Sequence, residues 1–115
     1  MGQVIIAGGA VVGELVQTVT ALTAGSTVTV DCSKGNVFTL TPAQAEAVNA
    51  TNVTNGEKVV INVLTSGTSS YTLTFGTNFV TTGTLATGTT SAKNFIIEFV
   101  SVGGNLIEVA RTTAM

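Results

Sequence analysis

The sequence contains no histidine and no tryptophan, and it has a single cysteine and a single proline. Without histidine, neither a Ser-His-Asp nor a Cys-His nucleophile can be assembled, and histidine-ligated metal sites are excluded as well. Cys32 has no partner for an intrachain disulfide, and we interpret it as a small buried hydrophobic side chain. The side-chain chemistry is therefore poor and does not by itself indicate a function. We expect no enzyme activity, no cofactor and no metal.

Charge is scarce as well. Charged residues make up 9% of the chain, against about 25% in an average soluble domain. The basic residues lie far apart in the sequence, so they form no cluster that would neutralise phosphates; they are Lys34, Lys58, Lys93 and Arg111. We therefore expect no nucleic acid partner. A chain with so few charges must cover apolar surface, which predicts self-association or docking on a larger body.

A membrane partner is not expected either. The longest uncharged apolar stretch runs from Val4 to Gly13, which is much shorter than the roughly 20 residues of a membrane-spanning helix. No basic segment of the kind that begins a secretory signal precedes it.

Alternation of apolar and polar residues dominates the rest of the chain and predicts short strands. In residues 27–31, Val28 and Val30 share one face, and threonine pairs such as Thr27/Thr29 are interpreted as facing solvent. Similar segments follow at 36–41, 57–65, 71–75 and 95–111, with these residues expected to point inward: Phe38, Leu40, Val59, Ile61 and Val63. Glycine and asparagine turns separate the segments. The pattern predicts an all-β fold, an antiparallel, jelly-roll-like β-sandwich.

The segment 57–65 has a second apolar face. Its outward positions carry Lys58, Val60, Asn62 and Leu64, so we expect both sides of this strand to be partly covered.

One short helix is predicted near residues 42–48. Thr41 supplies a hydroxyl N-cap, Pro42 takes the first helical position, and Gln44 stands at the capping-box position before an alanine-rich run. We divide the chain into an N-terminal apolar arm or strand, residues 1–22, and a β-sandwich domain, residues 23–115.

The C-terminal residues 95–111 predict a hairpin. A two-residue turn at Gly104-Asn105 would place Glu98 opposite Arg111 and would pair β-branched residues with one another.

A turn at Gly103-Gly104 would instead place Phe99 opposite Glu108. The sequence favours the first register, and an observed Phe99–Glu108 pair would reject it.

The glycine-rich run from Gly8 to Gly13 matches a dinucleotide-binding fingerprint, and Asp31 lies about where the ribose-binding acid would be. A cofactor enzyme of this kind requires a helix from Val12 to Leu22. Two features argue against it. Ala10 places a Cβ where the backbone must approach pyrophosphate, and no strand–helix unit is repeated downstream.

The acidic residues carry no evident site. They are scattered along the chain, and we interpret them as solvated single charges rather than as a catalytic pair; the five considered are Asp31, Glu46, Glu57, Glu98 and Glu108.

Several segments in a fixed order carry a resemblance. They are Leu22 to Asp31, Gly35 to Leu40, Thr72 to Phe79, Thr84 to Thr89 and Phe95 to Arg111. From about Ala21 onward, and most strongly from Val59 to Met115, the sequence resembles a small β-rich domain of tailed-bacteriophage virion proteins. The match departs at the hairpin tip, where Gly103-Gly104-Asn105 precedes Leu106 in place of an aspartate-glycine turn before an aromatic residue.

The resemblance implies a capsid decoration (cement) protein or a module of a tail or head fibre, in a symmetric oligomer. Because only about 20 residues precede the β-domain, we favour the decoration protein, located on the capsid exterior of the virion. We expect it to form a homo-oligomer, a trimer, and to bridge subunits of the major capsid protein. The apolar N-terminal arm would add a strand to a neighbour. The predicted capsid or subunit contacts are Val4, Ile5, Ile6, Val11 and Val12.

The alternative is a receptor-facing tip module that binds host glycans. This function requires exposed aromatic rings that stack on sugars, and only Phe79 and Tyr71 suit that role.

Overall fold

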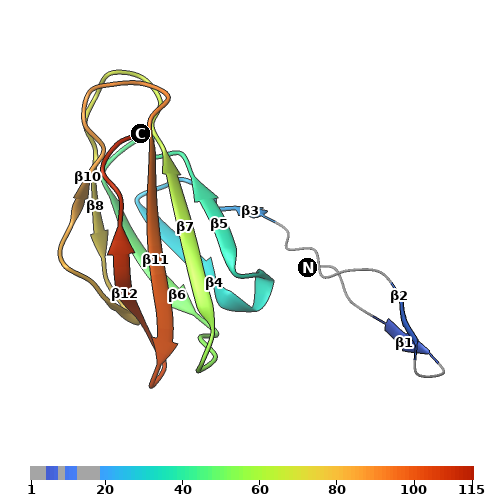
Figure 1. Cartoon of the computed structure of the whole chain (residues 1–115). Coiled ribbons are helices and arrows are strands. Elements are labelled where there is room, and N and C mark those ends of the chain that lie inside the picture. Colours follow the sequence, from blue (N-terminus) through green and yellow to red (C-terminus); the bar gives the residue numbers. More distant parts are fainter. Residues whose placement is uncertain (1–4, 8–9, 13–18) are drawn as a thin grey trace.

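The computed structural model describes residues 5–7, 10–12 and 19–115, and this part of the chain consists of strands and one short 3-10 helix (Figure 1). The helix η1 comprises Cys32–Lys34. The strands are β1 (Ile5–Ala7), β2 (Ala10–Val12), β3 (Val19–Ala21), β4 (Thr27–Asp31), β5 (Val37–Leu40), β6 (Glu46–Thr51), β7 (Lys58–Leu64), β8 (Thr72–Phe75), β9 (Phe79–Val80), β10 (Leu85–Ala86), β11 (Asn94–Val102) and β12 (Asn105–Arg111). The predicted all-β class is confirmed.

Two sheets enclose one core. A four-stranded sheet has the order β10-β8-β6-β4, and a six-stranded sheet has the order β3-β5-β7-β11-β12-β9. Strands β1 and β2 pair only with each other, and Figure 1 shows their hairpin standing clear of the two sheets. The predicted boundary at residue 22 falls after β3, whose residues pair with β5 in the six-stranded sheet.

From β3 to β8 the chain changes sheet at every strand. Strands β3, β5 and β7 therefore lie side by side in one sheet, β4, β6 and β8 lie side by side in the other, and all of these pairs are parallel. Crossing to the opposite sheet between successive strands returns each new strand in the direction of its neighbour, which a tight hairpin cannot do. The path is solenoid-like.

The expected antiparallel pairing is found only in part. It joins β7 to β11, β11 to β12, and β8 to β10, whereas β9 pairs with β12 in parallel. The sequence located strands β4, β5, β7, β8, β11 and β12, but the order in which strands pair depends on contacts between distant segments.

The predicted helix near residues 42–48 is wrong. Residues 46–51 form strand β6, which pairs on one side with β4 and on the other with β8. Alternate residues of this strand, Glu46, Val48 and Ala50, are buried. Hydrogen bonds along both edges and burial of one face outweigh the helix preference of an alanine-rich run.

The predicted inward residues are confirmed. Those of β4, β5 and β7 are buried together with Val48, Ala50, Leu73, Leu85, Ile97, Phe99 and Leu106 in a single cluster. Strict alternation within short strands therefore identified the inner faces of both sheets.

The C-terminal hairpin adopts the register that the sequence disfavoured. Phe99 pairs with Glu108, and the turn lies at Gly103-Gly104, with φ of 61° and 83°. A two-residue turn with positive φ at both central positions matches the twist of the flanking strands, and glycine reaches it without strain. Turn geometry therefore outweighed the favourable side-chain pairing of the other register.

A bulge at Val109 then shifts the ladder, because Glu98 pairs with Ala110 while the next residue, Phe99, pairs with Glu108. Residues three apart normally lie on opposite faces of a strand. The extra residue places Glu108 and Arg111 on the same face, so Arg111 meets Glu108 rather than Glu98.

This turn yields a test of the register. We expect Gly104→Ala to lower the free energy of unfolding by about 1–2 kcal/mol, because an added Cβ opposes the left-handed conformation. Steric contact plays no part, since no atom lies within 4 Å of the position of that Cβ.

The control is Gly25→Ala, where the added Cβ would meet only the Thr27 carbonyl at 3.7 Å. Urea denaturation of both variants measures the difference. Equal stability of the two variants would contradict the assigned turn.

Candidate functional site

The outer face of the six-stranded sheet is unusually apolar. A row of outward residues crosses four strands, in the order Val80, Ile107, Val100 and Lys58. A second row contains Val19, Val37, Val60 and Glu98. Three of these valines are well exposed, Val19 at 58%, Val80 at 50% and Val100 at 36%, and so is the neighbouring Val102 at 55%. We call this surface the aliphatic face.

Charge on the aliphatic face is confined to one pair. Lys58 Nζ lies 3.5 Å from Glu98 Oε2, and both side chains are substantially exposed. An exposed pair of this kind contributes at most about 1 kcal/mol to stability. The sequence had indicated a second apolar face only for β7, and the apolar residues at successive positions of β11 were the further signal.

The outer face of the four-stranded sheet is different. Its exposed positions on β4 and β8 carry threonine, namely Thr27, Thr29, Thr72 and Thr74. The interpretation of these threonine pairs as solvent-facing is therefore confirmed. One side of the body is polar and the other is aliphatic.

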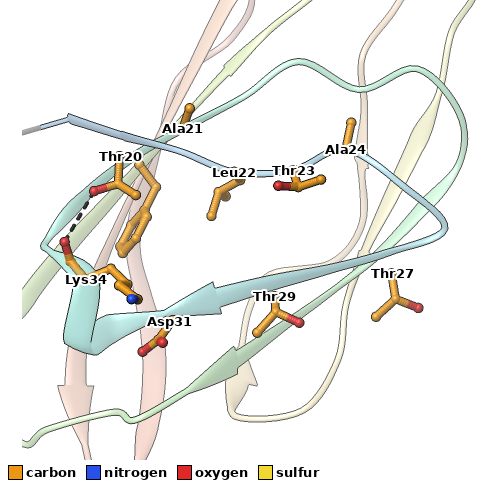
Figure 2. A pocket seen from close by; sticks show the side chains of 10 residues that line it. Thr20, Ala21, Leu22, Thr23, Ala24, Thr27, Thr29, Asp31 and Lys34 are labelled. Atoms are coloured by element: carbon orange, nitrogen blue, oxygen red, sulfur yellow. Dashed lines mark hydrogen bonds between the residues drawn. The ribbon is translucent and has the colours of Figure 1, made fainter.

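A groove lies between the two sheets at the end formed by β3 and β4. Its volume is about 430 Å³, and it is lined by Thr20, Ala21, Leu22, Thr23, Ala24, Thr27, Thr29, Asp31, Lys34 and Phe38. Figure 2 shows the segment from Thr20 to Ala24 passing over β4, with Leu22 pointing into the space between them. The hydroxyl of Thr20 donates a 3.3 Å hydrogen bond to the carbonyl of Lys34 at one end of the groove.

Asp31 at the end of β4 is held by hydrogen bonds. Its Oδ1 accepts from Asn52 Nδ2 at 2.8 Å, from Ser33 Oγ at 2.6 Å and from the Ser33 N–H at 3.0 Å. These hydrogen bonds, the one from the Asn52 side chain above all, lower the pKa of Asp31 to about 2. The carboxylate fixes the turn into η1, which is a structural role rather than the ribose contact of the dinucleotide hypothesis.

An ion pair lies at the opposite edge of the body, beside β9 and β10. Arg111 Nη2 lies 2.8 Å from Glu108 Oε1, and the Glu108 side chain is only 4% exposed. The Arg111 guanidinium also donates to the carbonyls of Gly83 and Thr84 and lies 5.8 Å from the centre of the Phe75 ring. The pair thus ties the loop between β9 and β10 to β12.

Two of the five acidic residues are buried, contrary to the expectation of solvated charges. Burial would raise the pKa of Glu108, but hydrogen bonds from Arg111 and Thr82 outweigh burial and lower it. Glu46 is 3% exposed. Burial raises the pKa of Glu46 by more than the hydrogen bonds from the Gly25 and Ala43 N–H groups lower it. Its second oxygen, Oε1, has no hydrogen-bond partner.

The remaining reactive groups are inert or isolated. Cys32 is buried, as expected, and burial raises its pKa to about 11, so its thiol stays protonated at neutral pH. Within the described residues, no group of three or more Cys, Asp or Glu side chains is placed to hold a metal ion.

The two residues expected to stack on glycans do not lie at a loop tip: Phe79 begins strand β9 and Tyr71 directly precedes β8. Phe79 packs into an aromatic cluster, with ring centres 5.3 Å from Phe75 and 5.2 Å from Phe99. Tyr71 is half-buried. The sugar-binding hypothesis therefore lacks a free aromatic ring at Phe79.

Four of the five predicted contact residues meet in one hairpin. Ile5 pairs with Val12, and Ile6 pairs with Val11, across β1 and β2. Val4 lies outside the described residues.

The helix required by the dinucleotide hypothesis is not formed where the structure describes its ends, because Ala10–Val12 and Val19–Ala21 are strands. No described helix has the length and apolarity needed to cross a membrane. No protein-family model matches this chain, and comparisons with curated proteins and with solved structures give no match.

The ion pair gives a pH-dependent prediction. Because the folded-state pKa of Glu108 is lowered, its stabilising effect is fully present above the ordinary pKa of about 4.5 and is lost as the pH falls from that value through the lower, folded-state pKa. We expect Glu108→Gln to lower the free energy of unfolding by about 1–3 kcal/mol at pH 7, and by much less near pH 3.

The matched control is Glu98→Gln, which removes the exposed pair with Lys58 and should cost less than about 1 kcal/mol. Thermal unfolding at both pH values gives the comparison. If Glu108→Gln lowers the free energy of unfolding equally at both pH values, the charge of Glu108 is not what stabilises the fold.

Proposed function

We propose that this protein is a non-enzymatic structural protein of a virion, a capsid decoration (cement) protein that oligomerises and bridges capsid subunits. The observation that carries the proposal is the aliphatic face. A soluble monomer rarely exposes a broad apolar sheet surface, and such surfaces are typical of protein contacts. The resemblance to domains of tailed-bacteriophage virion proteins supplies the class of partner, the major capsid protein.

The distribution of polarity supports a body with one adhesive side. Exposed valines on β9, β11 and β3 lie on one outer face, while threonines cover the other. Docking through the aliphatic face would leave the threonine face in water.

The N-terminal hairpin would add a second contact. The sequence of β1 and β2 consists only of isoleucine, valine and alanine, and Ile5, Ile6, Val11 and Val12 belong to it. Two contact regions on one chain let each copy join neighbouring subunits. Several weak contacts per oligomer then give strong attachment, because later contacts form at high effective concentration.

Sparse charge suits such a lattice. Copies that carry a formal net charge of −2 repel one another little when they are crowded on a shell. We describe the domain as a sandwich on the evidence of two sheets around one core. The finer assignment to a jelly-roll-like sandwich is a hypothesis, and the antiparallel pairs β7–β11, β11–β12 and β8–β10 support it.

Deletion of residues 2–12 tests the arm. We expect the shortened chain to bind undecorated capsids at least tenfold more weakly, a change of about 1.4 kcal/mol, as measured by co-sedimentation. Full binding by the shortened chain would remove the arm from the interface.

A pair of lysine variants tests the aliphatic face. We expect Val100→Lys to weaken capsid binding about tenfold, because it places a charge where apolar area must be covered. Thr74→Lys adds the same charge on the exposed face of β8 and should bind like the unmodified protein.

Both positions are exposed, but Val100 lies opposite Lys58, so Val100→Lys should lower the melting temperature slightly. Binding of both variants is therefore compared at a temperature where circular dichroism shows each to be folded. If the two bind equally well, the aliphatic face is not the capsid contact. A glycan-array signal without any capsid affinity would favour the receptor-binding alternative.

A further inference from the structure

The two sheets end together at an open pair of edges. Strand β3 is the last strand of the six-stranded sheet, and β4 is the last strand of the four-stranded sheet. The groove described above lies between them. Both edges are on the N-terminal side of the solenoid-like path, where a further coil of strands would stack.

Among the residues that the structure describes, none bonds to the backbone groups of β4 on this side. The Ala47 N–H donates to the Ser26 carbonyl at 2.9 Å, so Ser26 faces β6. Backbone groups alternate in direction along a strand, which turns those of Val28 and Val30 toward β6 as well. The N–H and C=O groups of Thr27, Thr29 and Asp31 therefore point outward from the edge.

This edge has little protection against a further strand. Proteins commonly block edges with proline, with charged side chains, with a bulge or with a covering loop. The one charged residue of β4 is Asp31 at its last position, where Oδ1 is already bound by Ser33 and Asn52. Strand β4 runs for five residues as Thr-Val-Thr-Val-Asp, pairs with β6 without a bulge, and has neither lysine nor proline. It is longer than β3, which has three residues.

The hairpin β1–β2 needs a further strand beside it, just as the edge of β4 can accept one. A lone two-stranded hairpin is marginally stable in water, and strand pairing joins this one to neither large sheet. Each of its strands keeps one outer edge free. Since β1 and β2 pair with each other, the hairpin can extend one sheet but cannot supply one strand to each.

We propose that the free edge of β4 accepts the N-terminal hairpin of a second copy of this chain, which extends the four-stranded sheet of its neighbour. The chain's own fold leaves donor and acceptor apart, as Figure 1 shows. Main-chain hydrogen bonds to Thr27, Thr29 and Asp31 would provide affinity. The inference deepens the proposed function by assigning the partner of the arm, and its assembly step does not require a capsid.

The contact is head-to-tail, because each chain has one donor and one acceptor. Such contacts close into rings when the rotation between copies permits it, and otherwise they form open chains. The trimer expected from the sequence is one such ring.

Disulfide trapping between two differently marked copies tests the proposal. One protein carries Cys32→Ser and Thr29→Cys. The other carries Cys32→Ser and a single cysteine introduced in turn at each of the six hairpin residues, Ile5, Ile6, Ala7, Ala10, Val11 and Val12. Cysteines on adjacent paired strands lie within the Cα separation that a disulfide spans. We expect at least one combination to give a disulfide-linked heterodimer on mild oxidation.

The control replaces Thr29→Cys with Ala86→Cys, on the edge strand at the other side of the same sheet. This combination should give at least tenfold less heterodimer. Failure of all six combinations to exceed the control overturns the proposal.

Proline substitution gives an independent measurement. Thr29→Pro removes an outward N–H to which no described residue bonds, so the pairing of β4 with β6 is kept. We expect its mass in light scattering to fall from the oligomer to the 11.6 kDa monomer. Ala86→Pro removes another outward N–H, since Thr87 N–H rather than that of Ala86 bonds to Tyr71, and should remain oligomeric.

If Thr29→Pro unfolds, the disulfide experiment alone decides. If the heterodimer forms but the protein does not bind capsids, the hairpin–β4 interface stands and the decoration function is wrong. Capsid binding without a heterodimer would retain decoration and reject this acceptor.

Discussion

An open β-sheet leaves unpaired N–H and C=O groups along its outer strands, and this constraint organises the molecule. At one end the outer strands β9 and β10 have two residues each, and Arg111 binds the loop between them. At the other end β3 and β4 border an open groove. One side therefore has short outer strands whose connecting loop is bound by Arg111, and the other has a longer outer strand beside a groove, which suits the proposed assembly.

The side chains give the body a second asymmetry. The aliphatic face and the threonine face belong to sheets that share one core, so they point in opposite directions. An apolar face stabilises contacts by losing water, whereas threonine keeps the opposite face hydrated and stiff. The proposed decoration function needs both properties, because a cement protein must adhere on one side and remain soluble on the other.

Three charged residues, Glu46, Glu108 and Arg111, are used within the fold. Glu108 and Arg111 lie on one face only because of the bulge at Val109, and their pair fastens a loop across the aromatic cluster. Glu46 occupies a buried strand position with one carboxylate oxygen unpartnered. Its raised pKa means that its contribution to stability diminishes as the pH rises, opposite to that of Glu108.

Local alternation in the sequence was enough to predict the strands and the inward positions, such as Val28, Phe38 and Ile61, because burial of one face imposes a period of two on neighbouring residues. The apolar composition near the N-terminus predicted an arm or strand there, and the structure forms two paired strands, β1 and β2. Local alternation could not predict the parallel order of β3, β5 and β7, the strand at Glu46–Thr51, or the groove beside β4. These features depend on hydrogen bonds between segments far apart in the chain, and the local residue pattern does not show which distant segments will pair. The register of the last hairpin likewise followed from the backbone angles of two glycines, which side-chain pairing does not reveal.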